Sequence, residues 1–162
     1  MKIDNVDDLL IDILGVPDHA LKEAEGWLEI TKLFEKAISS ANDLLVIDTE
    51  TTHYEDCQPY LQICYEDDGA MTIEAVSSKF LSPALSPDAQ NSLAELGWQL
   101  SEEEGLPNYF QFLHKEEADP KIIAQLFAQT FRTVYGVTPS DTIEIRAGQG
   151  VWPSENQRAE HE

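Results

Sequence analysis

Carboxylate side chains that could hold metal ions stand at the end of an apolar run. Asp48 and Glu50 close the run that begins at residue 44, and Thr49 separates them. Further along the chain, four residues separate His114 from Asp119. Two metal ions held by carboxylates can activate a water molecule for attack on a phosphodiester bond. The first chemistry to consider is therefore metal-dependent hydrolysis of a nucleic acid.

This set resembles part of the motif pattern of the DEDD-type 3′–5′ exonucleases, in which four carboxylates bind two metal ions. The pair Gln62-Ile63 adds to the resemblance, because a Gln-Ile pair follows the first motif in the ribonuclease D-like branch. The middle motif of that family, however, requires an aspartate on a helix. Between residues 76 and 112 only Asp88 is available. It stands at a predicted helix start, where the helix dipole accounts for a negative charge.

Asp119 and the charge of the chain also argue against a nuclease. Asp119 directly precedes Pro120, so it occupies the position of a helix N-cap and needs no metal ion to explain it. An exonuclease must attract a polyanion, but the ten cationic residues are scattered and form no basic stripe. A metal-dependent 3′–5′ exonuclease with Asp48, Glu50 and Asp119 as ligands is therefore only an alternative function. We expect no catalytic residues, no bound metal and no other cofactor.

The net charge limits the classes of partner. The 162 residues include 31 Asp plus Glu and 10 Lys plus Arg, which gives a formal net charge of -21. A field of this sign repels nucleic acid and anionic membranes, and it favours basic partners or simple solubility. A second alternative function follows, namely an acidic inhibitor or nucleic-acid mimic that occupies a basic surface.

Two further features of the sequence indicate a cytoplasmic protein. No stretch approaches the roughly 18–20 apolar residues of a membrane helix. The first apolar run is interrupted by Asp7, Asp8 and Asp12, which is not typical of a signal peptide. The two cysteines, Cys57 and Cys64, are too few for a disulfide framework, and we expect them to be free thiols.

Helical periodicity predicts two helices before the first strand. The apolar residues at positions 3, 6, 9, 10, 13 and 14 predict an N-terminal helical arm over residues 1–16, whose apolar stripe needs a surface of its own domain or of another chain. A longer helix is predicted from Asp18, its N-cap, to about residue 41.

Three strands are predicted next, over residues 44–50, 60–65 and 70–76. Apolar residues occupy both faces of the second strand, as expected where a sheet is covered on one side and lines a groove on the other. Gly69 completes a hairpin turn between the second and third strands.

The second half of the chain alternates helices and strands. A helix is predicted from Pro87, capped by Ser86 and ended by Gly97. An aromatic strand over residues 108–114, a long helix that begins after Asp119 and a short strand over residues 142–145 follow. This order predicts an α+β fold in which helices cover one side of an antiparallel sheet. We expect a single domain over residues 17–147 and a flexible C-terminal tail over residues 148–162.

Five short motifs from residue 58 to residue 146 resemble a known family. They are Tyr60-Leu61-Gln62-Ile63, the segment 72–81, Leu96-Gly97-Trp98, Pro107-Asn108-Tyr109-Phe110 and the segment 133–137. Their order and spacing resemble the actinobacterial TY-Chap group, which is related to YbjN proteins and to the CesT-like chaperones of type III secretion.

The resemblance implies a type III secretion chaperone-like fold and a non-enzymatic module that binds peptides or a partner protein. It also implies a polypeptide client, either basic or secreted, and a homodimer as one possible assembly. A sheet with apolar and amide side chains on its less covered face can accept an extended segment or a helix. The candidate partner-binding residues on this interpretation are Tyr60, Gln62, Met71, Glu74, Trp98 and Tyr109.

Overall fold

A computed structural model describes residues 18–100, 108–148 and 150–151. The predicted arm over residues 1–16 and most of the predicted tail lie outside these residues. Among the described residues, no helix is both long enough and apolar enough to cross a membrane.

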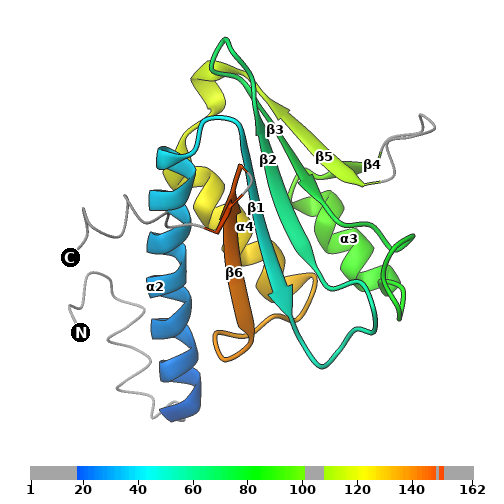
Figure 1. The fold of residues 1–162 in the computed structure, drawn as a ribbon. Coiled ribbons are helices and arrows are strands. Elements are labelled where there is room, and N and C mark those ends of the chain that lie inside the picture. Colours follow the sequence, from blue (N-terminus) through cyan, green and yellow to red (C-terminus); the bar gives the residue numbers. More distant parts are fainter. Residues whose placement is uncertain (1–17, 101–107, 149, 152–162) are drawn as a thin grey trace.

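An antiparallel sheet forms the centre of the fold (Figure 1). Within the described residues it has seven strands in the order β4-β5-β3-β2-β1-β6-β7. The strands are β1 (Leu44–Glu50), β2 (Tyr60–Tyr65), β3 (Met71–Ala75), β4 (Gln99–Leu100), β5 (Tyr109–Leu113), β6 (Thr142–Ala147) and β7 (Gly150–Val151). Because β1 pairs with β6, the C-terminal part of the domain closes against its first strand.

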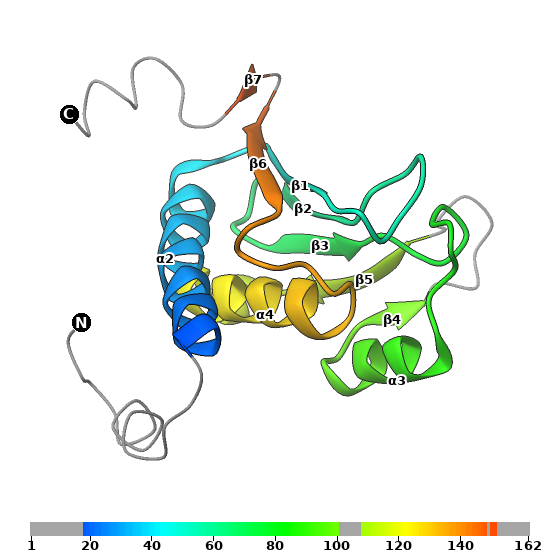
Figure 2. The same ribbon diagram turned by 90° about the horizontal axis from the view of Figure 1, so that it is seen from below.

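Three α-helices of the described part lie on one side of this sheet (Figure 2). They are α2 (Asp18–Ser40), α3 (Pro87–Glu95) and α4 (Pro120–Thr133), and a short 3-10 helix, η1 (Lys115–Glu117), precedes α4. Helices α2 and α4 also pack against each other. The predicted α+β class, with helices on one side of an antiparallel sheet, is confirmed.

Local sequence signals determine where the helices begin and end. The Ser86 hydroxyl accepts a hydrogen bond from the backbone N–H of Ala89, and the Asp119 carboxylate accepts one from Lys121. These are the N-cap bonds that the sequence predicts. Gly97 follows α3 with a φ of 92°, a left-handed conformation that only glycine adopts without strain.

Alternating residues of the central strands build the core on the helix-covered side. Leu45, Ile63 and Ile73 are paired across β1, β2 and β3, and each is fully buried. The helices complete this core with aromatic side chains, for example Phe34 of α2, whose ring centroid lies 6.0 Å from that of Phe131 in α4. One face of each of these three strands therefore lies in the hydrophobic core.

The structure adds to the predicted strands at both sheet edges. Two-residue strands β4 and β7 were not predicted, because so short a segment has no periodicity and is defined only by the neighbour it pairs with. Strand β6 continues two residues beyond the predicted end at residue 145, since Arg146 and Ala147 still pair with β1.

Candidate functional site

The face of the sheet that carries no described helix is called the open face. One row of side chains crosses it, from Val46 in β1 through Gln62 in β2 and Glu74 in β3 to Phe110 in β5. Residues that are directly opposite each other on paired strands point to the same face. Gln62, Glu74 and Phe110 are only half-buried, whereas the residues on either side of Gln62 and of Glu74 in their strands are in the core. This face is therefore accessible in the middle of a large sheet.

The polar groups of the open face bond to one another. Gln62 donates a hydrogen bond from Nε2 to a carboxylate oxygen of Glu74. Near the end of the sheet, Asn108 donates to the hydroxyl of Tyr60 at 3.0 Å. An amide and a carboxylate that are half-buried and hydrogen-bonded hold their orientation, and both retain acceptor or donor capacity for a ligand.

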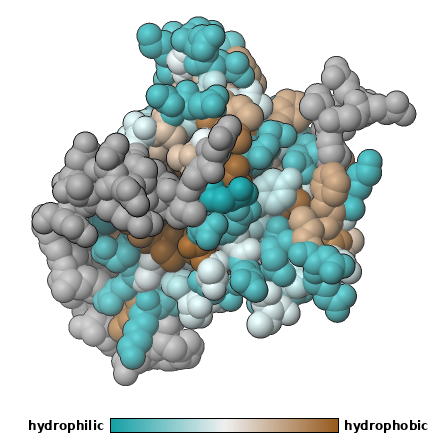
Figure 3. Space-filling model, in the orientation of Figure 1, coloured by the Kyte–Doolittle hydropathy of each residue, from teal (hydrophilic) through white to brown (hydrophobic). Residues whose placement is uncertain are grey.

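Phe112 gives the open face its most exposed apolar side chain. It lies in the row that also contains Thr72 and Cys64, and half of its surface, 50%, is exposed. The imidazole ring of His114 meets it edge-on, with 5.0 Å between ring centroids. Figure 3 shows hydrophobic patches among hydrophilic ones on this side of the molecule. A mixture of this kind suits a polypeptide, which offers both side chains and backbone.

Negative charges surround the row of side chains. Burial raises the pKa of the Cys64 thiol, and the carboxylates of Glu74, Glu66 and Asp43 raise it further. The thiol is therefore protonated at neutral pH and is a poor nucleophile. One cation offsets part of this charge, because Arg146 of β6 donates to Asp48 of β1 at 2.6 Å.

The six predicted partner-binding residues divide between the two sides of the sheet. Tyr60, Gln62 and Glu74 lie on the open face. The other three, Met71, Trp98 and Tyr109, are buried in the hydrophobic core. Two accessible residues of the open face, Phe110 and Phe112, were not among the predicted ones, and the alternation of the aromatic strand was the signal that could have found them.

Trp98 has a structural environment. Its indole N–H donates to the hydroxyl of Thr130 in α4 at 3.1 Å, and its ring stacks on Phe127 with 6.4 Å between centroids. Only 3% of its surface is exposed. Trp98 therefore fixes the end of α3 to α4.

The residues of the exonuclease alternative do not converge. The register places Asp48 level with Tyr60, at one end of the sheet, while His114 follows β5 at the opposite end. With about 3.3 Å per residue along a strand and about 4.8 Å between strands, the two are roughly 20 Å apart along the sheet and roughly 14 Å apart across it. Asp119 is occupied as the N-cap of α4. Over the part of the chain that the structure describes, no three His, Cys, Asp or Glu side chains are grouped for a metal ion.

A comparison with protein-family models identifies the family of this chain. Residues 20–148 match the model of TY-Chap3, described as the T3SS (YopN, CesT) and YbjN peptide-binding chaperone 3. The chain belongs to this family. The match begins near the start of α2 and ends after β6, so it includes six of the seven described strands and leaves out β7.

Membership in TY-Chap3 confirms the family resemblance and supports a chaperone-like binding role. The actinobacterial origin stays a prediction. Searches among curated proteins and among solved structures found no match. The binding surface of the domain must therefore be derived from its own geometry.

Proposed function

We propose that this TY-Chap3 domain is a non-enzymatic chaperone that holds a segment of a client protein on the open face. The observation that carries the proposal is the row from Gln62 through Glu74 to Phe110, which stays accessible in the middle of the sheet. A folded domain usually covers both faces of so wide a sheet or makes one of them polar throughout. A half-buried row of amide, carboxylate and phenylalanine does neither, and it suits a ligand of mixed chemistry.

The chemistry of the open face indicates a basic client segment with apolar side chains. Phe110 and Phe112 supply apolar contact area at one side, and Glu74 supplies negative charge. The net charge of -21 draws cationic segments toward the domain. An extended segment suits this face, because its side chains alternate and every second one can point toward the sheet. The cytoplasmic location and the homodimer stay predictions from the sequence.

Anisotropy titrations with fluorescent peptides test the proposal. The probes are three twelve-residue peptides that alternate valine with lysine, with serine or with glutamate. We expect the lysine peptide to bind best, the serine peptide more weakly and the glutamate peptide not at all. Substitution of Phe112→Asp should weaken binding of the lysine peptide roughly tenfold, which is the usual scale for loss of one central apolar contact.

The matched control is Ile122→Asp. Ile122 is as exposed as Phe112, at 60%, but it lies on α4, on the helix side of the sheet. This variant should bind the lysine peptide as the unaltered protein does. Absence of binding by all three peptides, or equal loss in both variants, would refute the open face as the site. A third outcome would favour the acidic inhibitor instead. In that case the lysine peptide no longer binds in moderate salt, and Phe112→Asp does not change its affinity.

A further inference from the structure

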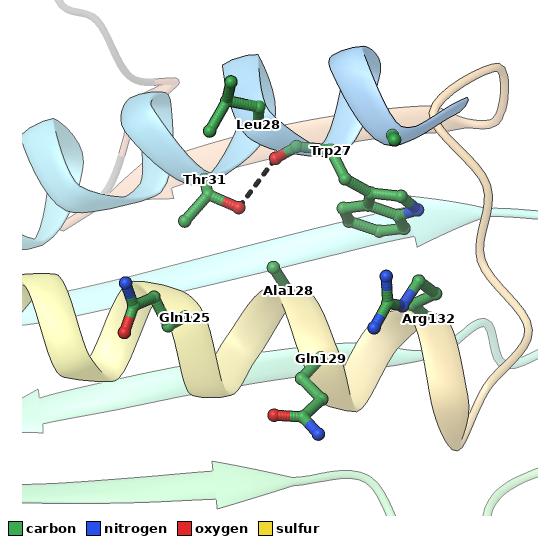
Figure 4. A pocket seen from close by; sticks show the side chains of 8 residues that line it. Trp27, Leu28, Thr31, Gln125, Ala128, Gln129 and Arg132 are labelled. Atoms are coloured by element: carbon green, nitrogen blue, oxygen red, sulfur yellow. Dashed lines mark hydrogen bonds between the residues drawn. The ribbon is translucent and has the colours of Figure 1, made fainter. Parts of the chain in front are cut away.

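A second accessible surface lies between helices α2 and α4, on the side of the molecule away from the open face. A hollow of about 380 Å³ lies there between the two helices, and Figure 4 shows the side chains that line it. Ala24 of α2 and Ala128 of α4 leave it open, because their methyl groups do not fill the space between the helices. Trp27 and Leu28 form its apolar wall, and Arg132 lies at one end. This surface is called the helix groove.

The helix groove has the properties of a surface that another element covers. Leu28 exposes 52% of its surface beside the hollow. An occupant that offers both apolar side chains and carboxylates would contact the apolar wall and pair with Arg132.

We propose that residues 3–14 of this chain dock into the helix groove as an amphipathic helix. Their apolar positions, 3, 6, 9, 10, 13 and 14, recur at helical spacing, and Asp7 and Asp12 flank this stripe. The segment is acidic, and the groove presents the cation Arg132 in a chain that has only 10 Lys plus Arg. Apolar pattern and charge thus both match the groove.

The length of the segment matches the distance it must cover. Gly15 and Pro17 separate it from α2, which begins at Asp18, and both residues favour a reversal of chain direction. Twelve helical residues span about 18 Å, and the stretch of α2 from Asp18 to Thr31 spans about 20 Å. A helix that runs back along α2 therefore reaches the far end of the groove, and residue 5 would lie close to Leu28.

The proposal is independent of peptide binding, because the helix groove and the open face lie on different sides of the sheet (Figure 2). Binding of the lysine peptide to Phe112 and docking of residues 3–14 can each fail without the other. A second copy of the chain is a rival occupant, since its own residues 3–14 carry the same pattern.

Paramagnetic relaxation in the full chain tests the proposal. A nitroxide is attached at Asn5→Cys in a background of Cys57→Ser and Cys64→Ser, and the protein is labelled with nitrogen-15. We expect loss of amide signal over residues 24–31 and 125–132, with little effect on β2 and β3. Leu28→Asp should restore the signals in the groove, while the control Ile122→Asp, at a somewhat more exposed position, should leave the loss unchanged.

Two further samples complete the test. Val6→Asp combined with Leu10→Asp alters the segment and leaves the groove intact, and it should also restore the signals. A mixture of spin-labelled chains without nitrogen-15 and nitrogen-15 chains without the spin label should show no loss. If the spin-labelled Asn5→Cys protein shows no loss of amide signal in the groove, docking of residues 3–14 is refuted. If the mixture shows the same loss as the single chain, docking within one chain is refuted and the groove binds the segment of another copy.

Discussion

The two faces of the sheet come from the same strands but differ in what their side chains contact. In β2, Leu61 and Ile63 point toward the helices and are fully buried, whereas Gln62 between them points to the open face and bonds to Glu74. The covered face is apolar and packed by three helices of the described part, and the open face mixes apolar, amide and acidic groups. Buried contacts are therefore concentrated on one face, and the other face is partly accessible.

The largest expected effect is on the covered face. Phe131→Ala removes a fully buried ring that lies 6.0 Å from Phe34 and 6.4 Å from Tyr135. Loss of such a ring leaves a cavity and should lower the free energy of unfolding by about 3–5 kcal/mol. Urea unfolding monitored by circular dichroism measures it. Phe112→Ala on the open face is the matched control and should cost less than about 1 kcal/mol. Similar losses in both variants would contradict the division between the faces.

A smaller effect is expected at Trp98, which distinguishes a structural from a binding role. Trp98→Phe removes the hydrogen bond to Thr130 and part of the stack on Phe127. We expect a loss of about 1–3 kcal/mol in the free energy of unfolding. Affinity for the lysine peptide should stay unchanged below the unfolding transition. A loss of affinity in the folded variant would instead return Trp98 to the binding residues.

The sequence predicted the positions of most elements because their signals are local. Ser86 and Asp119 as caps, Gly97 as a helix end and the alternation in β2 each depend on a few neighbouring residues. The family motifs from residue 58 to 146 were equally readable, and the family match confirms them. Nothing in these signals required knowledge of the tertiary fold.

The sequence could not tell which face of each strand the helices cover. In β5, Tyr109 and Phe110 are both aromatic, and only the packing of α3 and α4 determines that Tyr109 is buried. The same holds for Met71. Its alternation with Thr72 is clear from the sequence, but the face of the sheet to which its side chain points is not. The Asp48 and His114 motifs fail as a metal site for a related reason, since strand order and register separate them.

An intermediate effect is expected at high pH. Tyr65 and Tyr135 donate hydrogen bonds to the carbonyl oxygens of Ile38 and Val76, at 2.7 and 2.6 Å. Burial raises the pKa of both phenols above the ordinary value of 10. Above pH 10 the unfolded chain therefore releases these protons while the folded protein retains them, and the free energy of unfolding falls as pH rises. Below pH 10 both states are protonated and the contribution is fully present.

Between pH 9 and pH 11 the loss should be about 1 kcal/mol for each tyrosine. Urea unfolding across this range measures it, and Tyr65→Phe is the variant to compare. Because phenylalanine does not titrate, the free energy of unfolding of this variant should fall less steeply with pH. An identical slope in the two proteins would show that Tyr65 does not contribute.

The smallest effect is expected on the open face, at Glu74. Glu74→Gln keeps the shape of the side chain and removes one of the negative charges that raise the pKa of the Cys64 thiol. That pKa should fall, and the rate of alkylation by iodoacetamide at pH 8 should rise roughly twofold, the scale of one partly screened charge pair.

Cys57→Ser provides the background in which Cys64 is the single thiol. Glu117→Gln, a carboxylate of η1 that does not raise the pKa of this thiol, should leave the rate unchanged. If Glu74→Gln and Glu117→Gln change the alkylation rate equally, the thiol of Cys64 responds to the net charge of the whole surface and not to Glu74 in particular.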